Sequence, residues 1–110
     1  MMFKNSNKTP ELTPAEVHEQ LAAGSITLID VREPNEFAAE RIAGALPFPL
    51  SAFDPAGLPG GAVRPVVFHC AMGSRSAMAV AKCRAAGMPT AHMQGGIVAW
   101  KRAGLPTRMR

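Results

Sequence analysis

The sequence of 110 residues has no long hydrophobic run. No apolar stretch approaches the roughly 20 residues that are needed to cross a bilayer, which argues against a membrane protein. The residues before Thr9 contain no apolar core of the kind that a secretory signal needs, so we expect a cytoplasmic protein with no membrane partner. At this length the chain fits one domain with a core of its own.

The sequence also lacks a cysteine pair that could form a disulfide. Its two cysteines, Cys70 and Cys83, lie at opposite ends of an expected strand-to-helix unit. A mostly helical path between them implies a separation of about 15 Å or more, which is too far for a bridge. No cluster of cysteine and histidine has metal-ligand spacing, His18 and His92 are isolated in the sequence, and Cys83 is expected in the core.

Carboxylates are missing from the second half of the chain, where every residue after Asp54 is neutral or basic. The half that contains Cys70 therefore favours an anionic substrate. The net charge of +4 comes from the two ends, because residues 11–100 are slightly acidic. With no aromatic residues interleaved among the basic ones, this distribution argues against nucleic-acid binding, and the basic C-terminal tail is expected to be solvated.

Short apolar strands that alternate with helices predict an α/β domain with a parallel sheet. A capping box at Thr13-Pro14-Ala15-Glu16 begins the first helix, and Gly24 ends it. The expected strands are Ile26–Val31, Val66–His69 and Ala91–Met93, and the other expected helices are Pro34–Glu40, Ser74–Ala86 and Ile97–Ala103. Ala45–Phe48 is expected to be extended, and Ser51–Pro65 is expected to be mostly loop with a single helical turn. Met78, Val80, Ala81 and Ala85 are the expected packing residues of the helix after Cys70. A flexible segment, residues 1–9, is expected ahead of a domain at residues 10–110.

The stretch from Val66 to Ser76 combines a strand, a cysteine and the start of a helix. Cys70 therefore lies at a helix N-terminus, where unpaired backbone N–H groups and the helix dipole favour negative charge. A thiol in this position ionises readily, and the same amides can hold an oxyanion. The stretch predicts sulfur or oxyanion chemistry at Cys70, with a small buried core residue as the alternative.

Three separated segments resemble the rhodanese (sulfurtransferase) family. Residues 28–37 together with 42–45 are similar to its first signature, and residues 69–76 are similar to its active-site loop. Residues 94–100 with 104–106 resemble its C-terminal Gly-Gly…Trp element. The three segments cover about residues 11 to 106 in the family's order. Many relatives have Gly-His-Ile-Pro where this chain has Glu-Arg-Ile-Ala at residues 40–43, a departure that lies outside the cysteine loop.

The resemblance implies a rhodanese-like three-layer α/β domain, with a central parallel sheet and helices on both faces. It also implies that Cys70 is the catalytic residue of a sulfurtransferase. Cys70 would take a sulfane sulfur from a small anionic donor such as thiosulfate, become a persulfide, and pass the sulfur to cyanide or a thiol, with no cofactor or metal. An acceptor protein is a further expected partner. The implied substrate-binding residues are Ala71, Met72, Gly73, Ser74, Arg75 and Ser76, among which Arg75 is the expected anion contact.

Two other functions remain open. A phosphatase or arsenate reductase on the same fold needs Cys-x5-Arg, whereas Arg75 follows Cys70 with the shorter Cys-x4-Arg spacing. No aspartate follows the loop as a general acid. A non-catalytic docking or regulatory module usually lacks the cysteine, which is present here.

Several residues near the loop have purely structural interpretations. Asp30 and Arg32 predict a buried ion pair or a hydrogen bond that fixes loops. His69 alternates away from Phe68 and Cys70 and is expected to be buried on the other face of the strand. One of the two serines of the loop, Ser74 or Ser76, is expected to cap the helix. Trp100 is expected to be a packing anchor.

Overall fold

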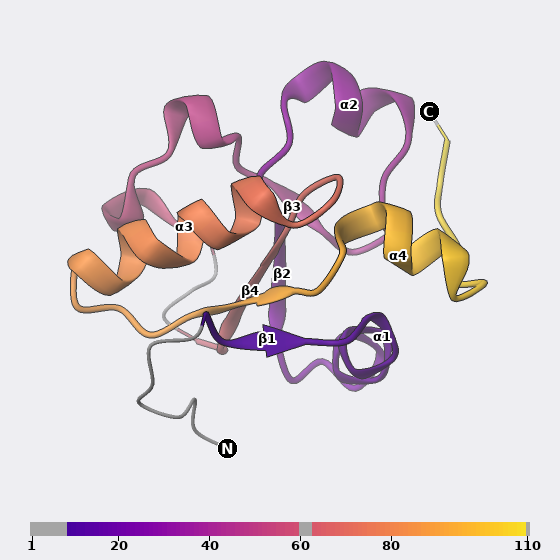
Figure 1. The fold of residues 1–110 in the computed structure, drawn as a ribbon, viewed down its shortest axis with the longest axis horizontal. Helices are drawn as coiled ribbons and strands as arrows, with labels where there is room; N and C mark the ends of the chain where they lie inside the picture. The colour runs from indigo at the N-terminus through magenta and orange to yellow at the C-terminus, as the bar shows by residue number, and fades with distance from the viewer. Residues whose placement is uncertain (1–8, 60–62, 110) are drawn as a thin grey trace.

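The computed structural model describes residues 9–59 and 63–109, which form an α/β domain around a five-stranded parallel sheet (Figure 1). The strand order is β1-β5-β4-β2-β3. The strands are β1 (Glu11–Leu12), β2 (Thr27–Asp30), β3 (Leu46–Pro47), β4 (Val66–His69) and β5 (Ala91–Met93). Every residue of β2, β4 and β5 is buried, as expected for parallel strands that are covered on both faces. The predicted fold class is thus confirmed; residues 1–8 of the predicted flexible segment lie outside the described residues.

The helices agree with the sequence predictions to within one or two residues. They are α1 (Pro14–Ala22), α2 (Pro34–Ala39), α3 (Ser74–Ala85) and α4 (Gly96–Arg102). The predicted capping box of α1 is formed, because the Thr13 hydroxyl accepts from the Glu16 N–H and the Glu16 carboxylate accepts from the Thr13 N–H. None of the described helices is long and apolar enough to cross a bilayer.

Two connecting segments differ from the prediction. The segment expected to hold one helical turn contains two short 3-10 helices, η1 (Leu50–Ala52) and η2 (Pro55–Gly57). The first strand, β1, was not predicted, because two residues are too few to show a periodic pattern. It adds to the sheet by pairing in parallel with β5 at the edge.

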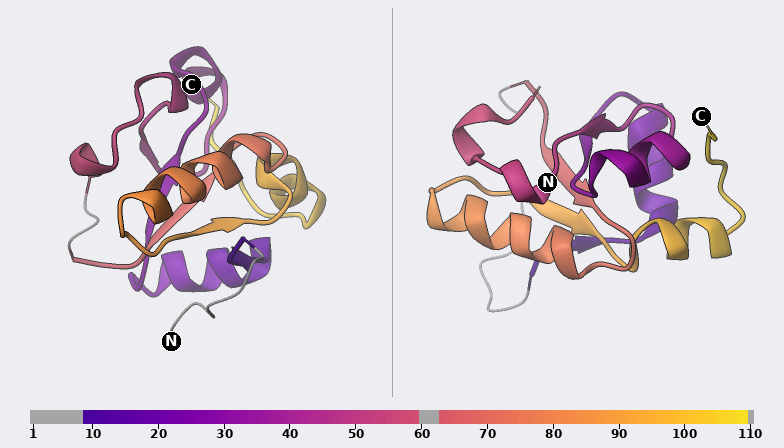
Figure 2. Two further views of the ribbon diagram at one scale, coloured as in Figure 1. Left: turned by 60° about the vertical axis from the view of Figure 1, so that its left-hand side comes forward. Right: turned by 90° about the horizontal axis from the view of Figure 1, so that it is seen from above.

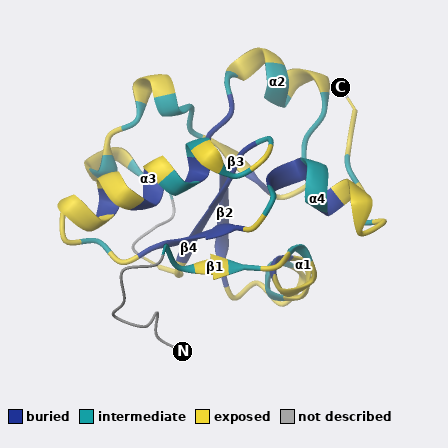
Figure 3. Ribbon diagram, in the orientation of Figure 1, coloured by how far each residue is buried: buried dark blue, intermediate teal, exposed yellow. Residues whose placement is uncertain are grey.

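Side-chain alternation along the strands divides the core into two clusters, one on each face of the sheet. The first cluster lies under α1 and α4 and includes Val17, Leu28, Val67, Met93 and Trp100. The second lies under α3 and includes Ile29, Phe68, Cys70, Val80 and Cys83. Figure 2 shows α1 and α3 on opposite sides of the sheet, and Figure 3 shows that the buried residues follow the strands and the inner helix faces. The predicted core positions of Cys83 and Trp100 are confirmed.

The predicted packing face of α3 is wrong for three of its four residues. Val80 is buried, but Met78 is 53% exposed and Ala81 and Ala85 are also exposed. The buried residues Ser76, Ala79, Val80 and Cys83 follow the three- and four-residue spacing of a single helix face. The helix is rich in alanine and small residues, so its sequence has little contrast between faces.

Candidate functional site

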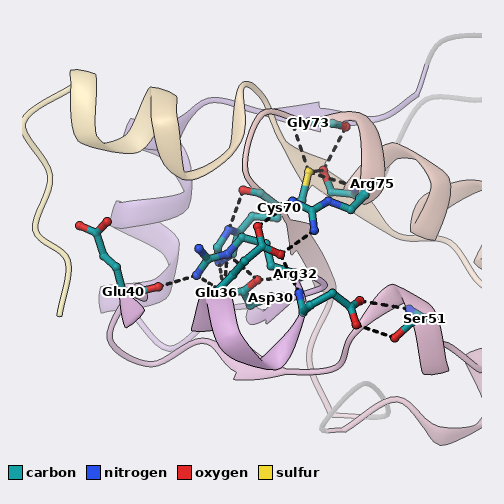
Figure 4. Close-up of polar contacts among 11 residues, drawn as sticks. Asp30, Arg32, Glu36, Glu40, Ser51, Cys70, Gly73 and Arg75 are labelled. Carbon is teal, nitrogen blue, oxygen red and sulfur yellow. Dashed lines mark hydrogen bonds and ion pairs between the residues drawn. The ribbon is translucent and has the colours of Figure 1, made fainter. Parts of the chain in front are cut away.

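The Cys70 side chain lies in the loop between β4 and α3, at the carboxyl edge of the sheet. Its residue is 1% exposed. The Sγ atom accepts a hydrogen bond from the backbone N–H of Gly73 at 3.1 Å (Figure 4). It accepts a second one from the backbone N–H of Ser76 at 3.3 Å. Gly73 is the residue before α3 and has φ +116°, a conformation that L side chains rarely adopt. This glycine lets the loop turn its N–H groups back onto the sulfur.

The surroundings of Cys70 favour the thiolate. Burial alone raises the pKa of the thiol, since a charge is poorly solvated there. The hydrogen bond between Cys70 and the Ser76 hydroxyl and those from the backbone N–H groups of Ser76, Gly73 and Met72 outweigh burial, so the pKa of Cys70 lies below its usual value. By contrast, burial raises the pKa of Cys83, and both cysteines are free.

Helix α4 holds the Cys70 loop from its outer side. The N–H of Ile97 donates to the carbonyl of Cys70 at 2.9 Å, and the N–H of Val98 donates to the carbonyl of Ala71 at 3.1 Å. These contacts require a close approach at Gly96, where a Cβ atom would clash with the carbonyls of Cys70 and Ala71. Because α4 engages the carbonyls, the N–H groups of the loop remain directed toward the sulfur.

The guanidinium of Arg75 is paired with a carboxylate of α2. Its Nη1 and Nη2 donate to the two oxygens of Glu36 at 2.7 and 3.0 Å (Figure 4). Arg75 and Glu36 are each about one-third exposed. The hydrogen bond from Arg75, aided by the backbone N–H of Glu33, lowers the pKa of Glu36 to about 2 despite some burial. The cation at Cys-x4-Arg is thus fixed in place by α2.

The expected ion pair of Asp30 and Arg32 is confirmed, and both side chains are buried. Arg32 donates from Nε and Nη2 to both Asp30 oxygens, and Nη2 also donates to the carbonyl of Glu40 at 2.6 Å. His69 lies on the same side, with its Nε2 3.5 Å from the Asp30 carboxylate. Burial holds the pKa of His69 below its usual value in spite of that carboxylate, so the ring is neutral at pH 7. The predicted structural role of His69 agrees with this placement.

One histidine that the sequence analysis left isolated reaches the cysteine site. His92 Nδ1 lies 2.7 Å from the hydroxyl of Ser76, and Ser76 Oγ lies 3.5 Å from Sγ of Cys70. On the other side of the ring, Nε2 lies 3.2 Å from the carboxylate of Glu11. Sequence reasoning missed both His92 and Glu11. The sequence did contain a signal for His92. Side chains alternate along a strand, so if Met93 faces the core under α1 and α4, the ring of His92 faces α3.

The other predicted loop residues are distributed around the sulfur. Ala71 is half-buried and Met72 is 72% exposed. The prediction that a serine caps α3 is wrong, because the cap position is Gly73 and no side chain caps it. Ser74 and Ser76 lie within the first turn instead, and the Ser76 hydroxyl contacts the Gly73 carbonyl at 3.2 Å. Within residues 9–59 and 63–109, no three His, Cys, Asp or Glu side chains are grouped so as to hold a metal ion.

Comparison with known proteins identifies the family. The model of the Rhodanese-like domain matches residues 13–103. An uncharacterized protein of Synechocystis sp., slr1261, is 36% identical over 107 residues, which cover 96% of this chain and 60% of that protein. A protein named sulfurtransferase from Allochromatium vinosum is 35% identical over 82 residues, covering 74% of this chain and 77% of that protein. The crystal structure of a thiosulfate sulfurtransferase from Pseudomonas aeruginosa has a TM-score of 0.82 at 26% identity, covering 92% of this chain and 20% of that one.

The chain therefore belongs to the rhodanese-like domain family, as its three sequence segments indicated. Its fold is shared with solved rhodanese-related structures. The chain spans 60% of the length of the Synechocystis relative.

Proposed function

We propose that this protein is a sulfurtransferase that moves a sulfane sulfur from a small anionic donor such as thiosulfate to cyanide or a thiol. Cys70 is the catalytic residue of this proposal. The observation that carries it is the pair of backbone N–H groups, from Gly73 and Ser76, that donate to Sγ. Family membership and the relative named sulfurtransferase support it.

The reaction proceeds in two displacements at sulfur. The Cys70 thiolate attacks the outer sulfur of thiosulfate, a new S–S bond forms, the S–S bond of thiosulfate breaks, and sulfite leaves with the electron pair. Cyanide then attacks the terminal sulfur of the persulfide, so thiocyanate leaves and the thiolate is regenerated. The negative charge lies on the cysteine sulfur before the first step and after the second, and on the terminal sulfur of the persulfide between them, and the loop N–H groups stabilise it at both positions. The chemistry needs no cofactor or metal.

The loop residues Ala71, Met72, Gly73, Ser74, Arg75 and Ser76 form the substrate site in this proposal. The pair with Glu36 occupies two of the five N–H donors of Arg75, so the guanidinium retains donors for a sulfonate oxygen of the substrate. We expect Arg75→Ala to raise the KM for thiosulfate with a smaller effect on kcat. An unchanged KM would remove Arg75 from the donor site. An acceptor protein and a cytoplasmic location stay predictions.

The decisive experiment is intact-mass analysis of the purified protein after exposure to thiosulfate. We expect the mass to increase by one sulfur atom, and we expect cyanide to discharge that sulfur as thiocyanate. Cys70→Ser must abolish both signals, while Cys83→Ala, the matched control in the core, must retain them. If neither thiosulfate nor a polysulfide loads Cys70, the sulfurtransferase proposal is wrong and a docking module becomes the better interpretation.

A further inference from the structure

The thiol of Cys70 is buried, yet it must lose a proton to become reactive. Cys70 and Ser76 are 1% and 0% exposed, and His92 is 3% exposed. A continuous series of polar contacts leads away from the sulfur, from Sγ to Ser76 Oγ, to the His92 ring and then to Glu11. The carboxylate of Glu11 is 44% exposed, so the series ends in solvent.

The fold places these groups in line. Parallel pairing of β1 with β5 sets Glu11 opposite His92 in the register of the sheet, so their side chains are neighbours on one face. Met93 belongs to the cluster under α1 and α4, which leaves His92 on the face that α3 covers. Ser76, in the first turn of α3, lies between this ring and the sulfur.

The contacts of His92 define the direction of its hydrogen bonds. The carboxylate of Glu11 only accepts, so the Nε2 atom that faces it carries a proton. In the neutral ring Nδ1 is then an acceptor. The Ser76 hydroxyl lies 2.7 Å from Nδ1 and 3.2 Å from its other acceptor, the Gly73 carbonyl, so it donates to the ring. Ser76 Oγ in turn accepts from the Cys70 thiol. All three donors therefore point away from the sulfur and toward Glu11.

We propose that Ser76, His92 and Glu11 form a proton relay that takes the proton of the Cys70 thiol. When the S–H bond breaks, the proton moves to Ser76 Oγ, and the hydroxyl proton of Ser76 moves to Nδ1 of His92. The resulting imidazolium remains between the thiolate and the Glu11 carboxylate, to which it donates, and it exchanges its proton with water through Glu11. No atom is oxidised or reduced. The inference deepens the proposed function, since it concerns how the same cysteine becomes a nucleophile.

The Glu11 carboxylate and a thiolate at Cys70 both favour the protonated form of the ring, whereas burial opposes it. Burial holds the pKa of His92 below its usual value, and the Glu11 carboxylate partly offsets the effect. Among the described residues, the titratable groups that face His92 are Glu11 from β1 and Cys70 from the loop after β4. Of the other neighbouring charges, Arg75 of α3 is paired with Glu36, and His69 of β4 lies against Asp30. A thiolate formed at Cys70 thus meets the His92 imidazolium as its nearby counter-charge.

The test measures the pKa of Cys70 without any sulfur donor. The rate of alkylation by iodoacetamide is followed against pH, and the label is located by mass spectrometry in the tryptic peptide that ends at Arg75, which excludes Cys83. The 3.5 and 2.7 Å contacts bring the ring within roughly 6 Å of the sulfur, where an opposite charge shifts a pKa by about one unit. We therefore expect His92→Asn to raise the midpoint of the profile by about one pH unit, and Glu11→Gln to raise it by less.

Matched controls separate a relay from a loss of packing. Glu19→Gln and His18→Asn change exposed residues of α1 and should leave the midpoint unchanged. Ser76→Ala should raise the midpoint, and the double variant of Ser76→Ala with His92→Asn should raise it no further, because the two groups act in series. A folded His92→Asn protein with an unshifted midpoint overturns the relay. If His92→Asn does not fold, Glu11→Gln decides, since its side chain is exposed and an unshifted midpoint there has the same meaning.

The outcome is independent of sulfur loading. A shifted midpoint in a protein that neither thiosulfate nor a polysulfide can load supports the relay and contradicts the sulfurtransferase proposal. A protein that thiosulfate loads, but whose midpoint does not change in His92→Asn and Glu11→Gln, supports the sulfurtransferase proposal and contradicts the relay.

Discussion

Replacing Gly96 by alanine tests how the cysteine loop is held. Gly96 has φ +64° at the start of α4, and a Cβ atom there would lie 2.5 Å from the carbonyl oxygen of Cys70 and closer still to the carbonyl of Ala71. Real Cβ atoms essentially never show such contacts, and the obstacle is backbone that cannot rotate away. We therefore expect Gly96→Ala to push the loop and α4 apart.

The cost of this substitution has two parts. A side chain in the left-handed conformation costs about 1–2 kcal/mol. Separation of the loop from α4 also breaks the hydrogen bonds from Ile97 and Val98 to the loop carbonyls, each of which contributes about 0.5–1.5 kcal/mol. The free energy of unfolding should fall by about 3 kcal/mol in total. Gly104→Ala is the matched control, because Gly104 has φ +78° with nothing within 4 Å of its Cβ position and should lose only the first part.

The two variants are compared by urea denaturation and by alkylation of Cys70. Gly96→Ala should lose about twice as much stability as Gly104→Ala, and it alone should raise the midpoint of the alkylation profile, because the loop N–H groups would move off the sulfur. The view that α4 shapes the loop would be refuted if Gly96→Ala and Gly104→Ala lost equal stability. It would also be refuted if the midpoint of the Cys70 alkylation profile were unchanged in Gly96→Ala.

Three further predictions follow from individual contacts. The Glu36 pKa of about 2 lies below its value in the unfolded chain. The stability that its pair with Arg75 provides, about 1 kcal/mol, is therefore present above pH 4.5 and is lost as the pH falls toward 2. The difference in urea midpoint between the wild type and Glu36→Gln should shrink over that pH range. Burial lowers the pKa of His69, so below about pH 6.5 the unfolded chain binds a proton that the native protein does not. The free energy of unfolding of the wild type should therefore fall between pH 7 and 5, and that of His69→Asn should fall less steeply. Urea denaturation of both proteins at several pH values measures the difference. Trp100→Phe loses the hydrogen bond from Nε1 to the Pro106 carbonyl and buried volume, and its free energy of unfolding should fall by about 2 kcal/mol; a loss below 0.5 kcal/mol would contradict the role of Trp100 as an anchor.

Much of the fold was predictable because its determinants are local. Continuous apolar runs defined β2 and β4, and the capping box of Thr13 and Glu16 defined the start of α1. Asp30 and Arg32, two residues apart at the end of a strand, were predicted to form a buried ion pair or a hydrogen bond that fixes loops, and the structure shows both. The cysteine at the mouth of a helix was evident from the strand–loop–helix pattern alone.

The part that escaped prediction depends on pairing between distant segments. The strand β1 exists only because two residues align with β5, about 80 positions later in the chain. That alignment alone brings Glu11 to His92, so Glu11 had no local signal, and the alternation around His92 could show only the face of the sheet on which the ring lies. The packing face of α3 was ambiguous for another reason, since its small residues offer no contrast in hydrophobicity until the sheet selects a face.

The tie between α4 and the cysteine loop also bears on how the protein is made. Synthesis is vectorial, and β4 and Cys70 leave the ribosome before Ile97 and Val98 do. Until α4 is made and docked, its N–H groups cannot bind the carbonyls of the loop. The peptide groups of the loop can then rotate, so their N–H groups are not held toward the sulfur. We therefore expect the Cys70 thiol of the nascent chain to behave as an ordinary thiol until α4 docks against the loop.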